Sequence, residues 1–489
     1  MMPHLATAAQ GTPNATELID TLTIDLSGEP DSIVPAIAYA PRDWSIVHAI
    51  HDSIVQFGPN GEIVPLAAES VTYVDDTTIE ITLRSGLTFH DGSPVTSAAI
   101  TRGVAHIQSA DSLVIDLFSA ITEVHEIDEL TAHIATSAPA PALLAQMVSW
   151  FVLLPEGATT DTLATSPIGT GPYRFVSHTS GSEIVLARNP DYPWGSPKGS
   201  PIAEQVTYRF VPESSTRVAD LASGDADIVI EIPEDQRDAI AGNGGTPVDA
   251  PLVGVSFIRL ITDEAPFDDA RVRQALNMAV DVQGIAEALV SPAATRLASI
   301  FPGPAAMGYD PDLAPFAYDP DAAKALLAEA GYADGFDTTF DITTAARQDV
   351  AEAIVAQLAE IGVNVTINVA EYADFNATYK DGTAPLRMIT WSPLYDPDTL
   401  LSLVFARDGY LSRYTSDEAD QLIAQAASET DAEARAALYR QLGQVMVDDP
   451  AAIYLYNSTE LYGVSARAAA WAPRGDEWVL PLAASSEAP

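Results

Sequence analysis

The chain of 489 residues contains no cysteine, so disulfide bonds and thiolate chemistry have no part in its fold or function. Lysine is nearly absent, with Lys198, Lys324 and Lys380 only. No stretch approaches the ~20 consecutive apolar residues that a transmembrane helix needs. Because 47% of the residues are hydrophobic and 19% are charged, the composition is that of a globular protein with sizeable cores.

Positive charge is scarce in total. The 68 acidic residues outnumber the 23 basic ones and give a formal net charge of −45. A surface of this sign repels nucleic-acid phosphates and anionic lipid head groups, so we exclude nucleic acid as a partner. The acidic residues are scattered along the chain, which is typical of a solvated surface.

The N-terminal segment 1–13 has neither the basic start nor the apolar run of a signal peptide. We expect this segment to be flexible, and we expect the sequence to begin after a signal that has been removed. The length predicts about three domains.

Enzyme motifs are missing as well. The sequence has no Gly-x-Ser-x-Gly elbow, no His-Glu-x-x-His pair and no phosphate-binding loop. Its many carboxylates single out no catalytic pair. We therefore expect a protein that is not an enzyme and binds no cofactor, with a secreted hydrolase as the disfavoured alternative.

Two closely spaced histidines stand at positions 48 and 51. His48 and His51 would share a face of a helix, with Asp52 adjacent, but a third clear ligand is missing, so we predict no metal site. His90 and Asp91 are predicted to lie in a turn, and no nucleophile near them supports acid–base catalysis.

The segment from Pro167 to Tyr192 predicts a glycine turn followed by a β-hairpin. Gly169 and Gly171 allow the backbone to turn and to approach other chain closely. Strands are expected at 173–177 and 183–188, because the second alternates polar and apolar residues.

Elsewhere the periodicity predicts an alternation of helices and strands. A first strand is expected at 17–26, a strand pair around the turn Asp75–Asp76, and a surface stretch at 190–201. A crossing between two halves is expected near 252–254. Asp268 or Asp269 is expected to cap a helix that contains 272–280, and Asp319 to cap one at 320–330. Periodicity predicts further helices at 350–361, 416–427 and 431–447, and strands at 363–369 and 452–456.

Several motifs carry a resemblance to a known family. The string PIGTGPYRF at 167–175 is followed by LARNPDY at 186–192 and by STRVADLASGDADI at 215–228. This order is similar to the central signature of family 5 extracellular solute-binding proteins of ABC importers. Five further segments keep the family's order, at 65–100, 265–281, 318–332, 391–400 and 435–456.

The resemblance implies an α/β fold of the type II periplasmic-binding-protein class, with two lobes, a hinge and an inserted extra domain. It assigns 14–51, 167–253 and 465–489 to lobe I, 52–166 to the inserted domain, and 254–464 to lobe II. It also implies a monomer that captures a small solute by hinge closure and delivers it to ABC permease subunits. The expected location is extracytoplasmic, either periplasmic or lipid-anchored to the outer face of the cell membrane.

The candidate cleft is the loop from Trp391 to Asp398, which two prolines keep out of regular structure and which presents aromatic rings. Peptide-binding members of the family usually have an aspartate three residues after this tryptophan, and it pairs with the α-amino group of the peptide. Leu394 stands there, so Asp396 or Asp398 would have to substitute.

The spacing of Trp391 and Tyr395 resembles that of nickel-binding members, in which both residues line the pocket. Tyr39 matches a pocket tyrosine of those members, and Trp44 stands where they have methionine. Their two chelate-binding arginines are replaced by Ala110 and Phe151, and their metal-ligating histidine has no counterpart, because 404–412 contains Arg407 instead.

These matches, together with Arg42 in the loop before the first helix, make up the predicted ligand-binding set. Its members are Tyr39, Arg42, Trp44, Phe151, Trp391, Tyr395, Asp396, Asp398 and Arg407. The solute is expected to be a short peptide or peptide-like compound, with a nickel or metallophore chelate and an oligosaccharide as open alternatives.

Overall fold

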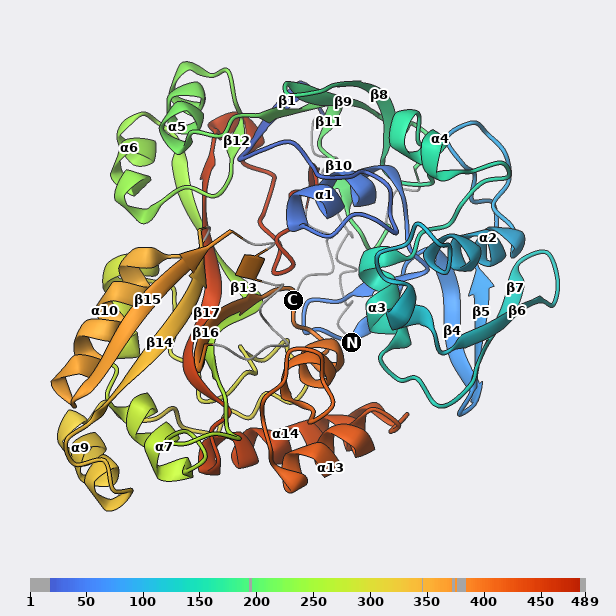
Figure 1. The fold of residues 1–489 in the computed structure, drawn as a ribbon. Coiled ribbons are helices and arrows are strands. Elements are labelled where there is room, and N and C mark those ends of the chain that lie inside the picture. Colours follow the sequence, from blue (N-terminus) through green and yellow to red (C-terminus); the bar gives the residue numbers. More distant parts are fainter. Residues whose placement is uncertain (1–17, 193–195, 345, 372–373, 376–383, 484–489) are drawn as a thin grey trace, which may run out of the picture.

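The computed structural model describes residues 18–192, 196–344, 346–371, 374–375 and 384–483, so the predicted flexible segment 1–13 lies outside it. A single ten-stranded mixed sheet runs through both lobes (Figure 1). Its strand order is β15-β14-β16-β13-β17-β12-β1-β11-β9-β8. No helix in the described ranges is both long and apolar enough to cross a membrane.

Lobe I contains the predicted first strand and hairpin. The strand β1 pairs in parallel with β11 and β12, and the hairpin β8–β9 completes this edge. The strands are β1 (Ile19–Leu26), β8 (Tyr173–Thr179), β9 (Glu183–Arg188), β11 (Ala203–Phe210) and β12 (Ile228–Val229). The helices are α1 (Pro41–Ile50), α5 (Ser214–Ser223) and α6 (Arg237–Gly242).

The glycines before the hairpin permit the close approach that the sequence predicts. A Cβ atom on Gly169 would lie 2.1 Å from the Ile50 carbonyl oxygen, and one on Gly171 would lie 2.6 Å from the Ile50 carbonyl carbon. His90 holds the same turn, because its Nε2 donates to the Gly171 carbonyl at 3.0 Å. His90 thus ties the turn that contains it to the glycine turn before the hairpin.

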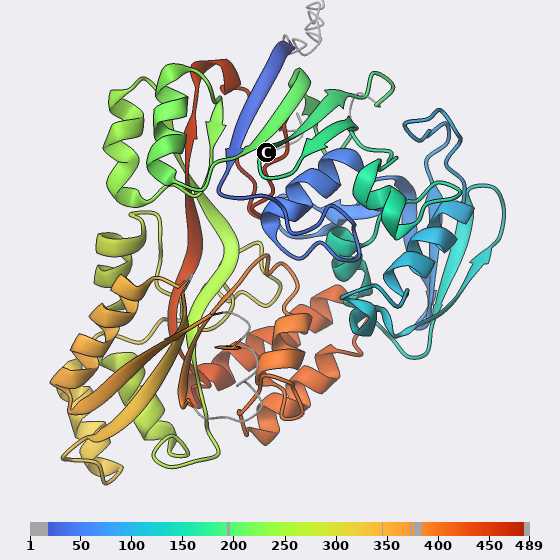
Figure 2. The same ribbon diagram turned by 45° about the horizontal axis from the view of Figure 1, so that its top comes forward.

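Two long antiparallel strands join the lobes, β13 (Thr246–Leu260) and β17 (Ala452–Val464) (Figure 2). The predicted crossing near 252–254 falls where the pairing register shifts, between Pro251 and Val255. The strand predicted at 452–456 was too short, since β17 continues through a polar stretch that pairs with β13 and β12.

Lobe II is a sheet covered on both faces. Alternate residues of β13 point to opposite sides, so that Phe257 joins one core and Ile258 the other. The other strands are β14 (Phe336–Thr343), β15 (Val363–Ala370) and β16 (Leu386–Trp391). One face is covered by α7 (Ala270–Met278), α8 (Val282–Ile285), α9 (Pro320–Glu329) and α10 (Gln348–Glu360).

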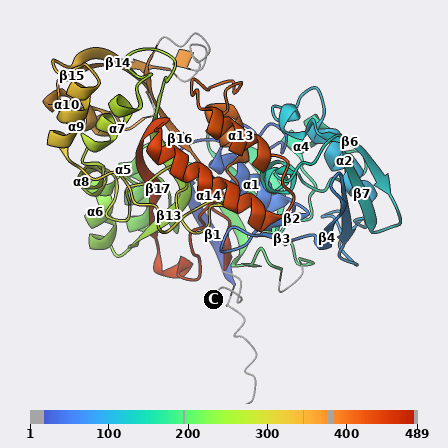
Figure 3. The ribbon, with the colours of Figure 1, turned by 90° about the horizontal axis from the view of Figure 1, so that it is seen from below.

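The opposite face of lobe II packs against α13 (Asp417–Ala426) and α14 (Ala432–Asp448), which lie toward the inserted sheet (Figure 3). Of the two aspartates expected to cap α7, Asp269 does so, and Asp319 caps α9 as predicted, because both side chains accept hydrogen bonds from the first turns of these helices.

The segment that follows β1 and α1 in the chain forms a separate four-stranded sheet with the order β4-β5-β7-β6. Its strands are β4 (Ala68–Asp75), β5 (Thr78–Leu83), β6 (Ile121–Glu126) and β7 (Thr131–Thr136). Beside it lie β2 (Val55–Phe57), β3 (Ile63–Pro65), α2 (Ala98–Ile107), α3 (Leu143–Trp150) and α4 (Thr160–Thr165). The exact domain boundaries stay a prediction.

The stretch 190–201, expected at the surface, contains a buried lysine. Lys198 is only 6% exposed, because its ammonium donates to the carbonyls of His48 and His51 at the end of α1. The short strand β10 (Ser200–Pro201) then pairs with β18 (Leu482–Ala483), which ties this stretch to the C-terminal segment.

Candidate functional site

The Trp391 loop, residues 391–398, connects the two lobes. Tyr395 stacks on Phe57 of β2 with ring centroids 4.2 Å apart, and Leu394 donates to the Val253 carbonyl of the hinge strand. The β2–β3 turn also meets lobe II, since a Cβ on Gly61 would lie 1.9 Å from the Ala305 carbonyl oxygen. The lobes are therefore in direct contact.

An aromatic row extends from the predicted cavity loop toward the C-terminal segment. Tyr39 contacts Trp150 with centroids 6.1 Å apart, Trp150 contacts Trp44 at 5.6 Å, and Trp44 contacts Trp478 at 6.2 Å. Tyr39 is 52% exposed, whereas Trp44 and Trp478 are 4% and 3% exposed. The row thus runs from solvent into the protein.

The C-terminal segment 474–478 lies between this row and the Trp391 loop. A Cβ on Gly475 would lie 2.9 Å from the Tyr395 hydroxyl, and Arg474 lies 5.7 Å from the Trp478 ring centroid. The indole nitrogens of Trp44, Trp150 and Trp478 are buried and have no hydrogen-bond partner. A buried donor without a partner costs free energy unless a solute or an ordered water molecule accepts its hydrogen bond.

The two aspartates of the Trp391 loop face an arginine. Arg435 of α14 forms a two-pronged ion pair with Asp396 and lies 3.5 Å from Asp398. Burial raises the pKa of Asp398, and the charge of Asp396 raises it further. Arg435 therefore neutralises the carboxylates that were expected to replace the missing amine partner.

The remaining predicted residues lie in different settings. Arg42 pairs with Asp31 at 3.2 Å near the start of α1. Phe151 is fully buried against Gly103, and Arg407 is bonded to Asp420 at 2.7 Å. Trp391 ends β16 and is half-buried. A role in solute binding stays a prediction for every member of the set.

The histidine cluster is a packing site within lobe I. His48 stacks on Trp478 with centroids 4.0 Å apart, and its Nε2 donates to the Ser149 carbonyl at 3.0 Å. His51 caps α1 instead of sharing its face, and Asp52 pairs with Lys198. Burial lowers the pKa of both histidines well below its usual value, so both are neutral at pH 7. In the described ranges no group of three or more histidine, aspartate or glutamate side chains is placed to hold a metal ion.

Sequence reasoning missed a set of three carboxylates at the hinge, here called the hinge carboxylates: Glu231, Glu460 and Glu477. The Glu231 backbone N–H donates to Glu460 Oε1 at 2.8 Å. Burial raises the pKa of Glu460 to about 8, and the charge of Glu477 adds to the shift. Burial also raises the pKa of Glu477 to about 7. Among 68 acidic residues, no sequence signal separates these three from the rest.

Comparison with known proteins places this arrangement in a family. The sequence model of bacterial extracellular solute-binding proteins, family 5 Middle, matches residues 62–411. Heme-binding protein A of Haemophilus influenzae is 28% identical, and the match covers 91% of this chain and 87% of that protein. The probable D,D-dipeptide-binding periplasmic protein DdpA of Escherichia coli is 26% identical, with coverage of 89% and 88%.

A solved structure agrees in fold. The ABC transporter substrate-binding protein CtaP from Listeria monocytogenes superposes with a TM-score of 0.83 at 21% identity, covering 96% of this chain and 99% of that chain. The two-lobed α/β fold expected from the motifs is thereby confirmed. The chain belongs to family 5 of the bacterial extracellular solute-binding proteins, the extracytoplasmic solute-binding components of ABC importers.

Proposed function

We propose that this chain captures a short peptide or peptide-like solute between its lobes and presents it to the permease as a monomer. The aromatic row beside the Trp391 loop carries the proposal. Rings of this kind supply apolar walls, and Tyr39, at the exposed end of the row, presents its ring to solvent.

Closure of the hinge explains how the solute is held. The contact between Phe57 and Tyr395 joins lobe I to lobe II. A solute that adds contacts across the same gap favours this closed arrangement over an open one. The liganded, closed form is the one that the permease would recognise.

The proposal also covers the mode of action and the location of the protein. The chain acts by binding alone, without turnover of its solute, and it is held at the outer face of the cell membrane by a lipid anchor or is free in the periplasm. The nickel-chelate and oligosaccharide alternatives rest on the Trp391 and Tyr395 spacing and on the aromatic walls. No observation in the described structure favours either of them over a peptide.

A thermal-shift screen of refolded, ligand-stripped protein tests the proposal. The probes are di- to pentapeptides, oligosaccharides, and nickel or iron with small chelators. A ligand at about 100 times its Kd adds about 2.7 kcal/mol of stability, which raises Tm measurably. A shift with peptides supports the proposal, and a shift with only sugars or chelates overturns it.

The variant Trp391→Ala tests whether the Trp391 loop contributes to solute binding. Loss of the indole should weaken peptide binding, while Tm of the ligand-free protein stays within a few degrees. A large fall in the ligand-free Tm would show that Trp391 supports the lobe II core rather than the cleft.

A further inference from the structure

The turn between β2 and β3, residues 58–62, reaches from the predicted inserted domain to lobe II. The turn is tight, because the Gly58 N–H donates to the Glu62 carbonyl at 2.7 Å and the Gly61 N–H donates to the Gly58 carbonyl at 3.0 Å. Gly61 has a φ of 83°, a conformation that glycine adopts at little cost. The turn therefore presents bare backbone to the opposite lobe at this residue.

Two groups of lobe II meet the turn at Gly61. A Cβ atom on Gly61 would lie 2.9 Å from the Ala305 carbonyl carbon and 3.3 Å from Cδ1 of Tyr395. Ala305 and Tyr395 belong to one surface, since the Met307 N–H donates to the Tyr395 carbonyl at 2.8 Å. Any side chain at Gly61 would prevent the lobes from approaching this closely.

The side chain of Tyr395 is enclosed by protein on several sides. Phe57 stacks on its ring with an interplanar angle of 24°, and a Cβ on Gly475 would lie 2.9 Å from its hydroxyl oxygen. Only 8% of Tyr395 is exposed. Little of its surface is left for a solute, although the resemblance to nickel-binding members predicts a pocket residue at this position.

A polar contact joins the same two parts of the protein at another place. Gln146 Nε2 of α3 donates to Thr399 Oγ1 of α12 (Asp398–Leu400) at 3.4 Å. The β2–β3 turn and α3 both come from 52–166, so two separate elements of the predicted inserted domain contact lobe II. The approach of the lobes therefore depends on this domain as well as on the hinge strands.

We propose that Gly61 and Tyr395 are positioning residues for solute capture, which set how readily the lobes close and do not touch the solute. Together with Phe57 and Ala305 they form what is here called the interlobe contact. The inference rests on the proposed capture of a solute between the lobes. If the solute is held by the closed form, its apparent affinity is proportional to the fraction of molecules able to close.

This role makes a distinctive demand on binding. A change in the interlobe contact should weaken the binding of every solute by the same factor, because it alters the protein's own equilibrium. A change in a wall of the cleft should instead discriminate between solutes, since it removes contacts that only some of them make.

Gly61→Ala and Gly86→Ala form a matched pair of variants. Both glycines have a positive φ, 83° and 79°, so alanine introduces comparable backbone strain at each position. A Cβ on Gly86 meets nothing within 4 Å, whereas one on Gly61 meets lobe II. The two variants thus differ in the clash between the lobes, and the ligand-free Tm checks that both are folded.

Closure is measured in the ligand-free full chain by cross-linking. Because the protein has no cysteine, Gln146→Cys with Thr399→Cys introduces a single reactive pair across the lobes. A short bismaleimide should join this pair at least tenfold more slowly when Gly61→Ala is added. Addition of Gly86→Ala should leave the rate within twofold.

Solute affinity is measured by calorimetric titration of the ligand-stripped chain with two tripeptides, Ala-Ala-Ala and Phe-Gly-Gly. Gly61→Ala should weaken the binding of both by one common factor of at least ten. Gly86→Ala should weaken neither by more than twofold.

The outcomes separate the two proposals. Slower cross-linking in Gly61→Ala with no binding of either tripeptide by the wild type supports the role of the interlobe contact and counts against peptide capture. An unchanged cross-linking rate in Gly61→Ala, or an equal fall in Gly86→Ala, overturns the inference. Weakening of only one tripeptide in Gly61→Ala also overturns it, because the turn would then act on the solute itself.

Discussion

The Lys198 ammonium lies 2.7 Å from the Asp52 carboxylate in an ion pair whose side chains are 3% and 8% exposed. The same ammonium donates to the His48 and His51 carbonyls at 2.7 Å each. It thus satisfies the free carbonyls at the end of α1, where the helix dipole also favours a positive charge. A single lysine from the segment before β10 fixes the helix that positions the aromatic row.

Lys198→Met should therefore destabilise the protein by about 3–5 kcal/mol, because a buried carboxylate and two carbonyls lose their partner. Urea unfolding followed by tryptophan fluorescence measures the loss. Lys324→Met on the exposed face of α9 is the control and should change stability by less than about 0.5 kcal/mol. A loss below about 1 kcal/mol in Lys198→Met would contradict this account.

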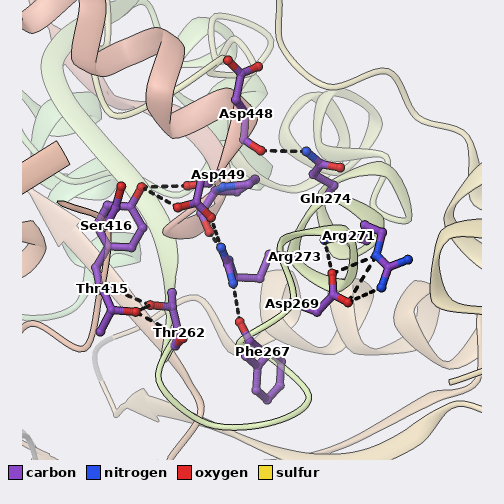
Figure 4. A network of polar contacts seen from close by, with 12 residues as sticks. Thr262, Phe267, Asp269, Arg271, Arg273, Gln274, Thr415, Ser416, Asp448 and Asp449 are labelled. Carbon is purple, nitrogen blue, oxygen red and sulfur yellow. Dashed lines mark hydrogen bonds and ion pairs between the residues drawn. The ribbon is translucent and has the colours of Figure 1, made fainter. Parts of the chain in front are cut away.

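Lobe II contains a comparable anchor at Arg273 (Figure 4). Its guanidinium bonds the carbonyls of Phe267 and Pro450 and the carboxylate of Asp449, and so ties α7 to the junction of α14 and β17. Arg273→Met should cost about 3 kcal/mol, since the side chain is only 4% exposed.

Arg271, two residues earlier on α7, offers a matched control. It also pairs with an aspartate, Asp269, but its side chain is 48% exposed. Arg271→Met should cost no more than about 1 kcal/mol, because solvent screens exposed pairs. Urea unfolding of both variants should give clearly different midpoints, and equal midpoints would show that burial is not the deciding factor.

The stacked rings of Phe57 and Tyr395 should stabilise the closed lobes. In a double-mutant cycle with Phe57→Leu and Tyr395→Leu, we expect a coupling of about 1 kcal/mol in the affinity for the solute found in the screen. Tyr332→Leu, which disturbs a ring pair within lobe II, should leave that affinity unchanged. Additive effects of the two leucine variants would show that the contact does not contribute to closure.

Local signals in the sequence predicted much of the fold. The hairpin after Gly171 and the caps at Asp269 and Asp319 depend on neighbouring residues, so composition and spacing reveal them. The extension of β17 past Tyr456 depends on pairing with β13 and β12, which no local pattern encodes.

The candidate site was harder to predict for the same reason. The loop from Trp391 to Asp398 has a recognisable sequence, but the burial of Lys198 and the pairing of Asp396 with Arg435 arise from contacts between distant segments. The hinge carboxylates come from three separate stretches of an acidic chain. Only the folded structure shows that their charges act on one another.

The hinge carboxylates also predict a pH dependence of stability. The pKa of Glu460 is raised from 4.5 to about 8 by burial, and the charges of Glu477 and Glu231 add to this shift. Between these two pH values the folded state holds a proton that the unfolded state has released. The stability that this proton contributes is therefore fully present below about pH 4.5 and is lost as the pH rises through 8.

Tm of the ligand-free protein should accordingly fall between pH 5 and pH 8, and Glu460→Gln should reduce the slope and raise Tm at pH 8. Glu477→Gln should act similarly up to about pH 7, the pKa of that side chain. Differential scanning calorimetry across this range measures both effects, with Glu360→Gln as the exposed control. If Glu460→Gln follows the wild-type curve at every pH, then Glu460 is already ionised at neutral pH in the folded protein.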